Sequence, residues 1–367
     1  MNNRLTRNAL TLLTMIIALG GCRMSGPVLA PTPEAMPVEL QQLAYPLQPG
    51  LNISISVFDN LQQDETGMGR LYAPIREVEA SYLPVILRDT LFESGAWGAV
   101  RVAPVTDTAA ELQISGTIQR STALELSLHI QARDSLGNLW LDRDYQDVAD
   151  ASSYEPGSRE RYPFRNLFNR IANDLLLVRQ ATSKAQANNV LRGSMLRYAI
   201  SLAPQAFSDY LVSNDAGLAE VAYLPAANDP IYQRVRQIRE SEYLFTDVIN
   251  EQYDAFYQDL QKVYPFWQRY SYELLAFNNR IAADGSMSGR KARSGSWDAT
   301  EDVYKTFREY KLNVDELREL VSAFRSESRD TVTELEGNII ELNGPLKKQY
   351  QQWRDILRRM YAAERGE

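Results

Sequence analysis

The chain has 367 residues, of which 39 are Lys or Arg and 47 are Asp or Glu, so its formal net charge is −8 at pH 7. This acidic balance disfavours nucleic acid as a partner, and no basic stripe with interleaved aromatic residues argues otherwise. Hydrophobic residues make up 44% of the chain, which is enough for a globular core, and the length suggests about two domains. The single cysteine excludes an internal disulfide framework.

The first 21 residues have the layout of a secretory signal peptide. Arg4 and Arg7 precede an apolar stretch from 9 to 19, and two small residues follow it, directly before Cys22. The apolar stretch is too short to span a bilayer. We therefore expect residues 1–21 to be removed.

Residues Gly20, Gly21 and Cys22 resemble the lipobox of bacterial lipoproteins, which ends in two small residues and an invariant cysteine. The resemblance implies that the Cys22 thiol carries a diacylglyceryl group, that the chain is cut between Gly21 and Cys22, and that the new amino terminus is acylated. A chance cysteine after an ordinary signal peptide is the alternative. Three acyl chains suffice for stable anchoring, so the resemblance implies a partner membrane reached through lipid.

The residue after Cys22 is Arg23 rather than the aspartate associated with retention at the inner membrane. The lipoprotein resemblance therefore implies the outer membrane of a Gram-negative cell, with the protein facing the periplasm. Loss of two arginines and no acidic residue with the signal peptide would take the net charge from −8 to −10.

Residues 22–50 are predicted to be a tether. The stretch from 23 to 50 contains six of the 16 prolines and has no apolar periodicity. Such a segment behaves as a semi-extended spacer, with a reach of up to roughly 3 Å per residue, or about 85 Å.

Residues 51–150 predict a compact α/β unit. Apolar and polar side chains alternate over 51–57, the pattern of a half-buried strand. Ser81 is a suitable N-cap for a helix that would carry Pro84 in its first turn and end at Gly95.

A second short strand is expected over 99–102, followed by three alternating runs joined by short turns. The three runs cover about 112–118, 124–130 and 139–145. The predicted order is strand, helix, strand, then a three-strand meander.

This order, with Ser94-Gly-Ala-Trp97 closing the helix and Ala99-Val-Arg-Val102 opening the next strand, resembles a known periplasmic α/β domain. It is similar to the amino-terminal domain of TolB and to the domain of the lipoprotein activators of peptidoglycan synthases and of the curli-secretion lipoprotein. The resemblance covers about 100 residues. It implies a protein-docking module without catalysis.

After a polar stretch at 150–161, the remaining chain is predicted to be helical. Apolar residues recur at spacings of three and four over 164–178 and 191–202, and Pro204 ends the second of these helices. Residues 212–230 look like a looser connection.

Seven-residue repeats predict two long helices, at about 231–282 and 300–343. Pro265 should kink the first, and Gly344 marks the end of the second. We expect an antiparallel, coiled-coil-like pair within a helical domain of residues 160–367. The predicted fold class is therefore α+β.

No catalytic constellation stands out. His129 is the only histidine and falls on the polar side of its strand, where an exposed position is the simpler interpretation. The sequence has no G-x-S-x-G nucleophile elbow. Because the only cysteine would carry lipid, zinc is poorly supplied with ligands. We expect no catalytic residue, no metal and no cofactor.

Paired carboxylates could still serve a glycan hydrolase. Asp142 and Asp144 share a strand face, and Asp64-Glu65 follow the first strand. Their hydrophilic surroundings offer nothing that would raise the pKa of a general acid. A cryptic envelope hydrolase is therefore a third possibility beside the two hypotheses below.

Two features of the helical region could bind a partner. Arg290, Lys291 and Arg293 form a basic cluster in a Gly/Ser-rich stretch, suited to an anionic target or simply to a solvated connection. Trp267 and Tyr270 fit a bundle core better than a ligand cage.

Two functional hypotheses follow. In the first, the protein is a non-enzymatic adaptor or assembly factor of the cell envelope with a protein partner. In the second, its helices bind a lipid or glycan, as in transport auxiliary lipoproteins, which requires a sizeable apolar cavity.

Overall fold

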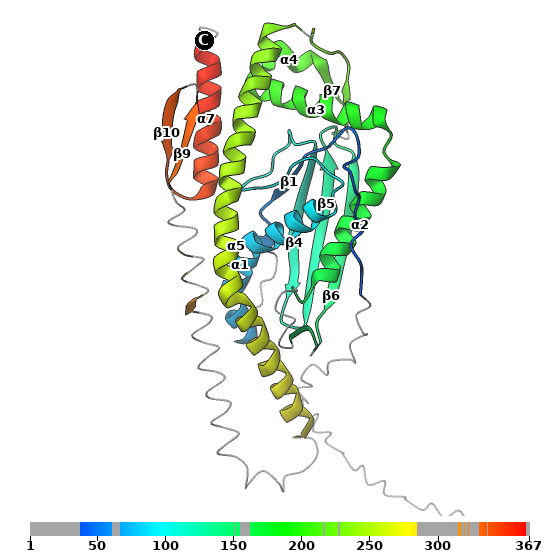
Figure 1. Cartoon of the computed structure of the whole chain (residues 1–367), viewed down its shortest axis with the longest axis vertical. Coiled ribbons are helices and arrows are strands. Elements are labelled where there is room, and N and C mark those ends of the chain that lie inside the picture. The colour runs from blue at the N-terminus through cyan, green and yellow to red at the C-terminus, as the bar shows by residue number, and fades with distance from the viewer. Residues whose placement is uncertain are drawn as a thin grey trace, which may run out of the picture.

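The computed structural model describes residues 37–60, 67–150, 152–154, 162–215, 217–226, 228–284, 330–335 and 337–364, and positions 315, 316, 319 and 322. This part of the chain has a mixed α+β fold, as the sequence predicts. Figure 1 shows a sheet with helices packed on it and the long helix α5 (Pro230–Asp284) running beside it.

The main sheet has the strand order β3-β1-β4-β5-β6, and a short β2 pairs with β4. Strands β1 and β3 are joined through α1 and run parallel, whereas β4, β5 and β6 form an antiparallel meander. The strands are β1 (Ile53–Ser56), β2 (Asp59–Asn60), β3 (Val100–Ala103), β4 (Leu112–Ser121), β5 (Glu125–Asp134) and β6 (Leu139–Val148). Strand β1 is buried on both faces, and not on one as expected, because Ile53 and Ile55 face the hydrophobic core while Ser54 lines a cavity under α5.

Helix α1 (Gly67–Glu93) begins well before the predicted N-cap Ser81, so Pro84 lies inside it. A proline cannot donate a hydrogen bond to the carbonyl four residues earlier, which here belongs to Ala80. That carbonyl instead accepts a hydrogen bond from the Phe58 backbone N–H at 2.9 Å. The interior proline therefore leaves an acceptor free for the chain that follows β1. The helix ends as predicted, with Gly95 at φ +66°.

One hydrophobic core joins the two predicted domains. Helices α1 and α2 (Arg165–Ala181) pack against each other and against the sheet, which contributes alternate residues of β4 and β5. The same core includes Leu260 and Trp267 of α5. The expected division between residues 51–150 and 160–367 is therefore not a boundary in the core.

Residues 37–50, here called the strap, are bound to the folded body. The sequence predicts a free tether for this stretch. Asn166, Asn169 and Asn173 stand along α2 and hold the strap backbone through their side-chain amides. Asn166 and Asn169 bind the N–H and C=O of Val38 at 2.9 and 2.7 Å, and Asn173 accepts from Gln41 N–H at 2.8 Å. The dark blue trace beside α2 in Figure 1 is the strap.

Helix α5 covers the outer edge of the sheet. The Asn250 side chain accepts from the N–H of Val102 at 2.8 Å and donates to its C=O at 3.0 Å, so one amide pairs with edge strand β3 as a neighbouring strand would. Arg101 on β3 pairs with Asp247 on α5, and Arg88 on α1 pairs with Asp254. The predicted helix over 231–282 corresponds to α5, and the half that contains Pro265 changes direction in Figure 1.

Residues 331–342 form the hairpin of β9 (Thr331–Leu335) and β10 (Asn338–Leu342), so the predicted helix over 300–343 is wrong for this part. The cause lies in the register, because Leu335 pairs with Asn338 across the turn. Positions 331, 335, 338 and 342 consequently share one face of the hairpin and imitate a heptad pattern. Most of residues 300–330 lie outside the described part, although positions 315, 316, 319 and 322 are helical.

Helix α7 (Leu346–Glu364) packs antiparallel to α5, since Arg234 near the start of α5 pairs with Glu364 at the end of α7. The rings of Phe245 and Trp353 stack at 4.9 Å between them. At the top of Figure 1, α3, α4 and β7 close the molecule. These connecting elements are α3 (Lys184–Leu202), α4 (Pro204–Phe207), β7 (Leu211–Ser213) and β8 (Ala219–Val221).

Candidate functional site

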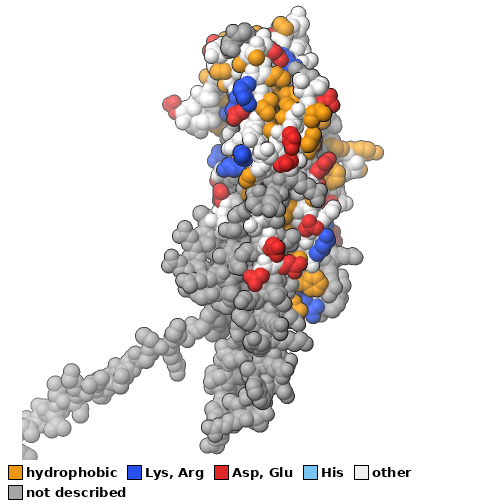
Figure 2. Space-filling model, turned by 90° about the vertical axis from the view of Figure 1, so that its left-hand side faces the viewer, with side chains coloured by type: hydrophobic (Ala, Val, Ile, Leu, Met, Phe, Trp, Pro, Cys, Tyr) orange, Lys and Arg blue, Asp and Glu red, His pale blue; other side chains and the backbone are white. Residues whose placement is uncertain are grey.

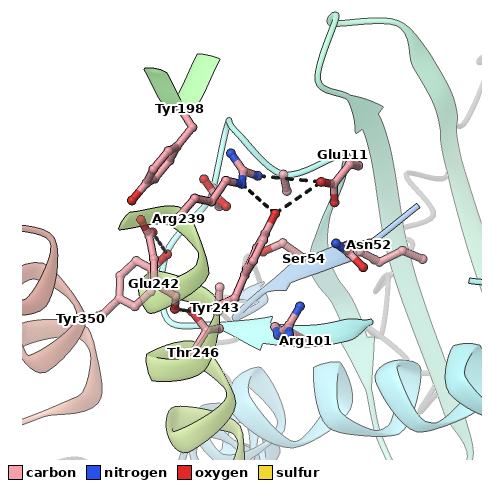
Figure 3. A pocket seen from close by; sticks show the side chains of 14 residues that line it. Asn52, Ser54, Arg101, Glu111, Tyr198, Arg239, Glu242, Tyr243, Thr246 and Tyr350 are labelled. Carbon is pink, nitrogen blue, oxygen red and sulfur yellow. Dashed lines mark hydrogen bonds and ion pairs between the residues drawn. The ribbon is translucent and has the colours of Figure 1, made fainter. Parts of the chain in front are cut away.

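A small polar cavity lies where the sheet edge meets α3, α5 and α7 (Figure 3). Its volume is about 30 Å³, which is room for about one water molecule. The polar side chains that line it come from β1, β3, the loop before β4, and three helices. They are Asn52, Ser54, Arg101, Asp107, Glu111, Tyr198, Arg239, Glu242, Tyr243, Thr246 and Tyr350.

Arg239 is the centre of this cluster and is 5% exposed. Its guanidinium lies between the rings of Tyr198 and Tyr243, at 4.9 and 5.0 Å from their centroids. It donates to the backbone oxygens of Ala109 at 2.7 Å and Ser194 at 3.1 Å. It also donates to the Tyr243 hydroxyl at 2.8 Å. The guanidinium is therefore held by acceptors of the protein itself.

Glu111 supplies the nearest negative charge, with its Oε1 3.9 Å from Arg239. The same oxygen accepts from Ser194 Oγ at 3.2 Å and from Tyr243 Oη at 3.3 Å. Its other oxygen, Oε2, is buried and accepts no hydrogen bond from the described residues. Burial alone would lower the pKa of Arg239, but Tyr243, Glu111 and Asp107 together raise that pKa above its ordinary value. The arginine therefore stays charged.

The hydroxyl of Tyr243 remains protonated near neutral pH. Burial raises the pKa of Tyr243 to about 12, an effect that the charge of Arg239 partly offsets. It can therefore donate to Glu111 while it accepts from Arg239.

A second carboxylate, Glu242, ties α7 to the same cluster. It accepts from Tyr350 Oη at 2.9 Å and pairs with Arg354 Nε at 3.2 Å. Burial, and then Glu242, raises the pKa values of Tyr198 and Tyr350. Arg354 also approaches Asp107 at 3.8 Å. The arrangement joins α3, α5, α7 and the loop before β4, and we call it the polar junction.

The polar face of the meander holds the predicted His129, Asp142 and Asp144 close together. His129 is 37% exposed, with Nδ1 2.9 Å from Asp144 and Nε2 3.2 Å from Asp142. Hydrogen bonds from His129 and then Gln119 lower the pKa of Asp144. Asp144 is therefore ionised and unsuited to donate a proton as a general acid. In the described part of the chain, no three His, Cys, Asp or Glu side chains are grouped so that they could hold a metal ion.

Several predicted site residues lie outside the described part. They are Gly21 and Cys22, the pair Asp64-Glu65, and the basic residues Arg290, Lys291 and Arg293. Among the helices that the structure describes, none is both long and apolar enough to cross a membrane.

Trp267 is buried in the core and Tyr270 packs against it, as predicted. Next to them is a residue that sequence reasoning missed. Glu79 on α1 is 1% exposed and accepts hydrogen bonds from Ser121 at 2.8 Å and from the Tyr264 hydroxyl. A single acid on an apolar helix face was the available signal, and the predicted helix began after it.

Exposed apolar residues gather around β7 and β8, and we call them the distal surface. They are Val212 (58% exposed), Leu218 (40%), Tyr223 (70%) and Leu224 (49%). Tyr223 and Leu224 line a groove of about 410 Å³ against Asn189 and Arg192 of α3. Sequence reasoning treated this segment as a loose connection.

Figure 2 faces the side of α7 and the β9–β10 hairpin and shows hydrophobic side chains over its upper half. On the hairpin, Val332 and Ile339 are 61% and 80% exposed. Their strands pair in one register, so both side chains lie on the outer face of the hairpin.

No family model matches the sequence, and no curated protein matches it. A solved structure of a PelC dodecamer from Paraburkholderia phytofirmans is 13% identical, over 39% of this chain and 96% of that chain, with a TM-score of 0.23. Protein XCC0632 from Xanthomonas campestris is 12% identical, over 40% of this chain and 94% of that chain, with a TM-score of 0.24. Likenesses of this size assign the chain to no family.

Proposed function

We propose that this protein is a lipid-anchored outer-membrane lipoprotein that faces the periplasm and acts as a non-enzymatic adaptor or assembly factor for a protein partner. The observation that carries the adaptor role is the distal surface, where four large apolar side chains of one short segment are exposed beside a groove. Exposed apolar surface gathered in one region is typical of interaction sites.

The anchoring part of the proposal rests on the sequence. Gly20, Gly21 and Cys22 resemble a lipobox, and the strap that follows is built into the fold. A lipid on Cys22 would therefore be connected to a folded body by the short stretch before Pro37.

The helical region contributes two further expectations. The repeats from 303 to 324 support a helix that packs at a shallow angle on α5, as in a coiled coil. Arg290, Lys291 and Arg293 follow α5 closely in sequence and suit an anionic target such as a lipid headgroup.

The alternative, a lipid- or glycan-binding transport auxiliary lipoprotein, needs a large apolar cavity among the helices. The cavity at the polar junction has about 30 Å³, which is too small for a lipid or a glycan. This cavity therefore gives the alternative no support.

The adaptor proposal is tested by crosslinking in cells. A photoreactive amino acid replaces Tyr223, which is 70% exposed on the distal surface; the matched control replaces Phe92, which is 74% exposed at the end of α1. We expect the same envelope protein to be captured repeatedly at position 223 and not at position 92. The double variant Tyr223→Ser and Leu224→Ser should abolish a crosslink formed from the neighbouring position 218.

No crosslink at 223, or equal capture at both positions, would contradict the adaptor role. The anchor is tested separately, because labelled palmitate should enter the full chain and not the Cys22→Ala variant. An unlabelled wild-type chain would refute the lipid anchor.

A further inference from the structure

We infer that the protein stands on the membrane with the C-terminal end of α5 toward the bilayer and the distal surface away from it. The inference rests on the proposed lipid on Cys22 and adds an orientation, a membrane-facing end and a partner-facing end.

The strap begins at one end of the molecule. Val38 is held by Asn166 and Asn169 in the first turns of α2. The backbone N–H of Leu167 bonds to Asp147 near the end of β6. The strap then runs in the same direction as α2, since Arg179 donates to the carbonyl of Pro49.

The C-terminal part of α5 lies at this same end. After β6, Ala149 N–H bonds to the carbonyl of Leu124 in the β4–β5 turn. The neighbouring Ala123 carbonyl accepts from Tyr154, whose ring stacks on Tyr272 of α5 at 4.9 Å. Helix α5 continues beyond Tyr272 to Asp284, and Figure 1 shows it extending below the sheet.

The distal surface lies at the opposite end. Ala219 of β8 donates to the carbonyl of Leu136 in the β5–β6 turn at 2.8 Å. Phe207 of α4 contacts the ring of Tyr232 at the start of α5, with centroids 6.1 Å apart. Tyr232 and Tyr272 are forty residues apart on one helix, which is about 60 Å along the helix.

The stretch between Cys22 and the strap is short. Pro37 is fifteen residues after Cys22, so even a fully extended chain spans at most about 50 Å. In an inverted molecule that stretch would have to run back along the ten residues of β6, about 33 Å, and then past the distal surface before it reached the bilayer. This path needs a nearly fully extended chain, whereas an upright molecule needs none, so we expect the end where the strap begins to face the membrane.

The absence of any other cysteine in the mature chain makes this orientation measurable. The full-length lipidated protein carries one added thiol, as Glu273→Cys beside Tyr272 or as Ser213→Cys on β7, two exposed positions. Each is labelled with a donor dye and reconstituted into phosphatidylethanolamine–phosphatidylglycerol vesicles that contain an acceptor lipid. We expect energy transfer at least threefold higher from position 273 than from 213.

Equal transfer from both positions would mean that the molecule lies flat, and higher transfer from 213 would mean that it is inverted; either result overturns the inference. A control insertion of 30 Gly/Ser residues between Glu34 and Ala35 should reduce the ratio toward one, whereas an unchanged ratio would show that chain length does not set the orientation. If the wild-type protein fails to float with the vesicles, the proposed anchor itself is refuted.

Discussion

Arg239 shows how a buried charge organises its surroundings. Burying a guanidinium is costly unless hydrogen bonds and an opposite charge compensate for the lost water. Here Ala109, Ser194 and Tyr243 accept its hydrogen bonds, and Glu111 supplies the charge. The polar junction can therefore fix α5 in one position and one rotation against the loop before β4.

The variant Arg239→Met should destabilise the fold by about 3–5 kcal/mol, because it leaves the Glu111 carboxylate buried without its partner. The free energy of unfolding in urea measures the effect. The control Arg236→Met, on the exposed side of the same helix, should change it by less than about 0.5 kcal/mol. Adding Glu111→Gln to Arg239→Met should recover part of the lost stability. A double variant with a lower free energy of unfolding than Arg239→Met alone would contradict this account.

The stability of the polar junction should also depend on pH. The pKa of Tyr243 is raised to about 12 in the folded chain, against about 10 when unfolded. Its contribution is complete below about pH 10 and is lost as the pH rises toward 12, since the unfolded chain releases its proton first. Urea unfolding between pH 8 and pH 11.5 should show a steeper loss for the wild type than for Tyr243→Phe, and coincident curves would refute the assignment.

Single residues on the polar face of the meander were predictable, but their partners were not. Alternation along β5 was enough to put His129 on the polar side. Its contacts with Asp142 and Asp144 depend on the pairing of β5 with β6, and a one-residue change of register would separate them. The polar junction was missed because its members come from separate segments, and partners such as Glu111 and Tyr243 are more than 100 residues apart.

At the scale of elements, a single side chain takes the place of a strand at the edge of the sheet. Unpaired strand edges promote association with other chains. Asn250 satisfies both backbone groups of Val102, and α5 covers the strand beside them.

The variant Asn250→Leu should cost about 2–5 kcal/mol, since the N–H and C=O of Val102 would stay buried without partners. Faster hydrogen exchange at the Val102 amide should accompany the loss. Asp247→Ala on the same helix removes only the ion pair with Arg101, in which Asp247 is 52% exposed, and should cost at most about 1 kcal/mol. Equal losses of stability in the two variants would show that the pairing of Asn250 with the Val102 backbone does not stabilise the fold.

Periodicity predicted the elements well where one pattern alone was possible. The β4–β6 meander and the region of α5 are examples. It failed for α1, where Pro84 looked like a first-turn proline because its true compensation, the bond from Phe58 to Ala80, is tertiary. It also failed at 331–342, where the two-residue turn of a hairpin reproduces a helical spacing.

At the scale of the whole molecule, hydrophobic clusters cross the predicted division into two domains. Helix α2 lies over the sheet, and the C-terminal half of α5 contributes Leu260 and Trp267 to the same cluster. Periodicity predicts the type of most elements but not which apolar faces meet. The strap was missed for a similar reason, because the asparagines that hold it lie on α2, more than 120 residues later.

The strap also determines how the protein would bear a mechanical load. A pull on the proposed anchor would reach the body at Val38 and act along the strap, parallel to α2. The bonds from Asn166, Asn169, Asn173 and Arg179 to the strap backbone would then be loaded together in shear, and not broken one after another as in peeling. A partner held at the distal surface could thus be dragged by the membrane, with the tension carried through α2 into the core.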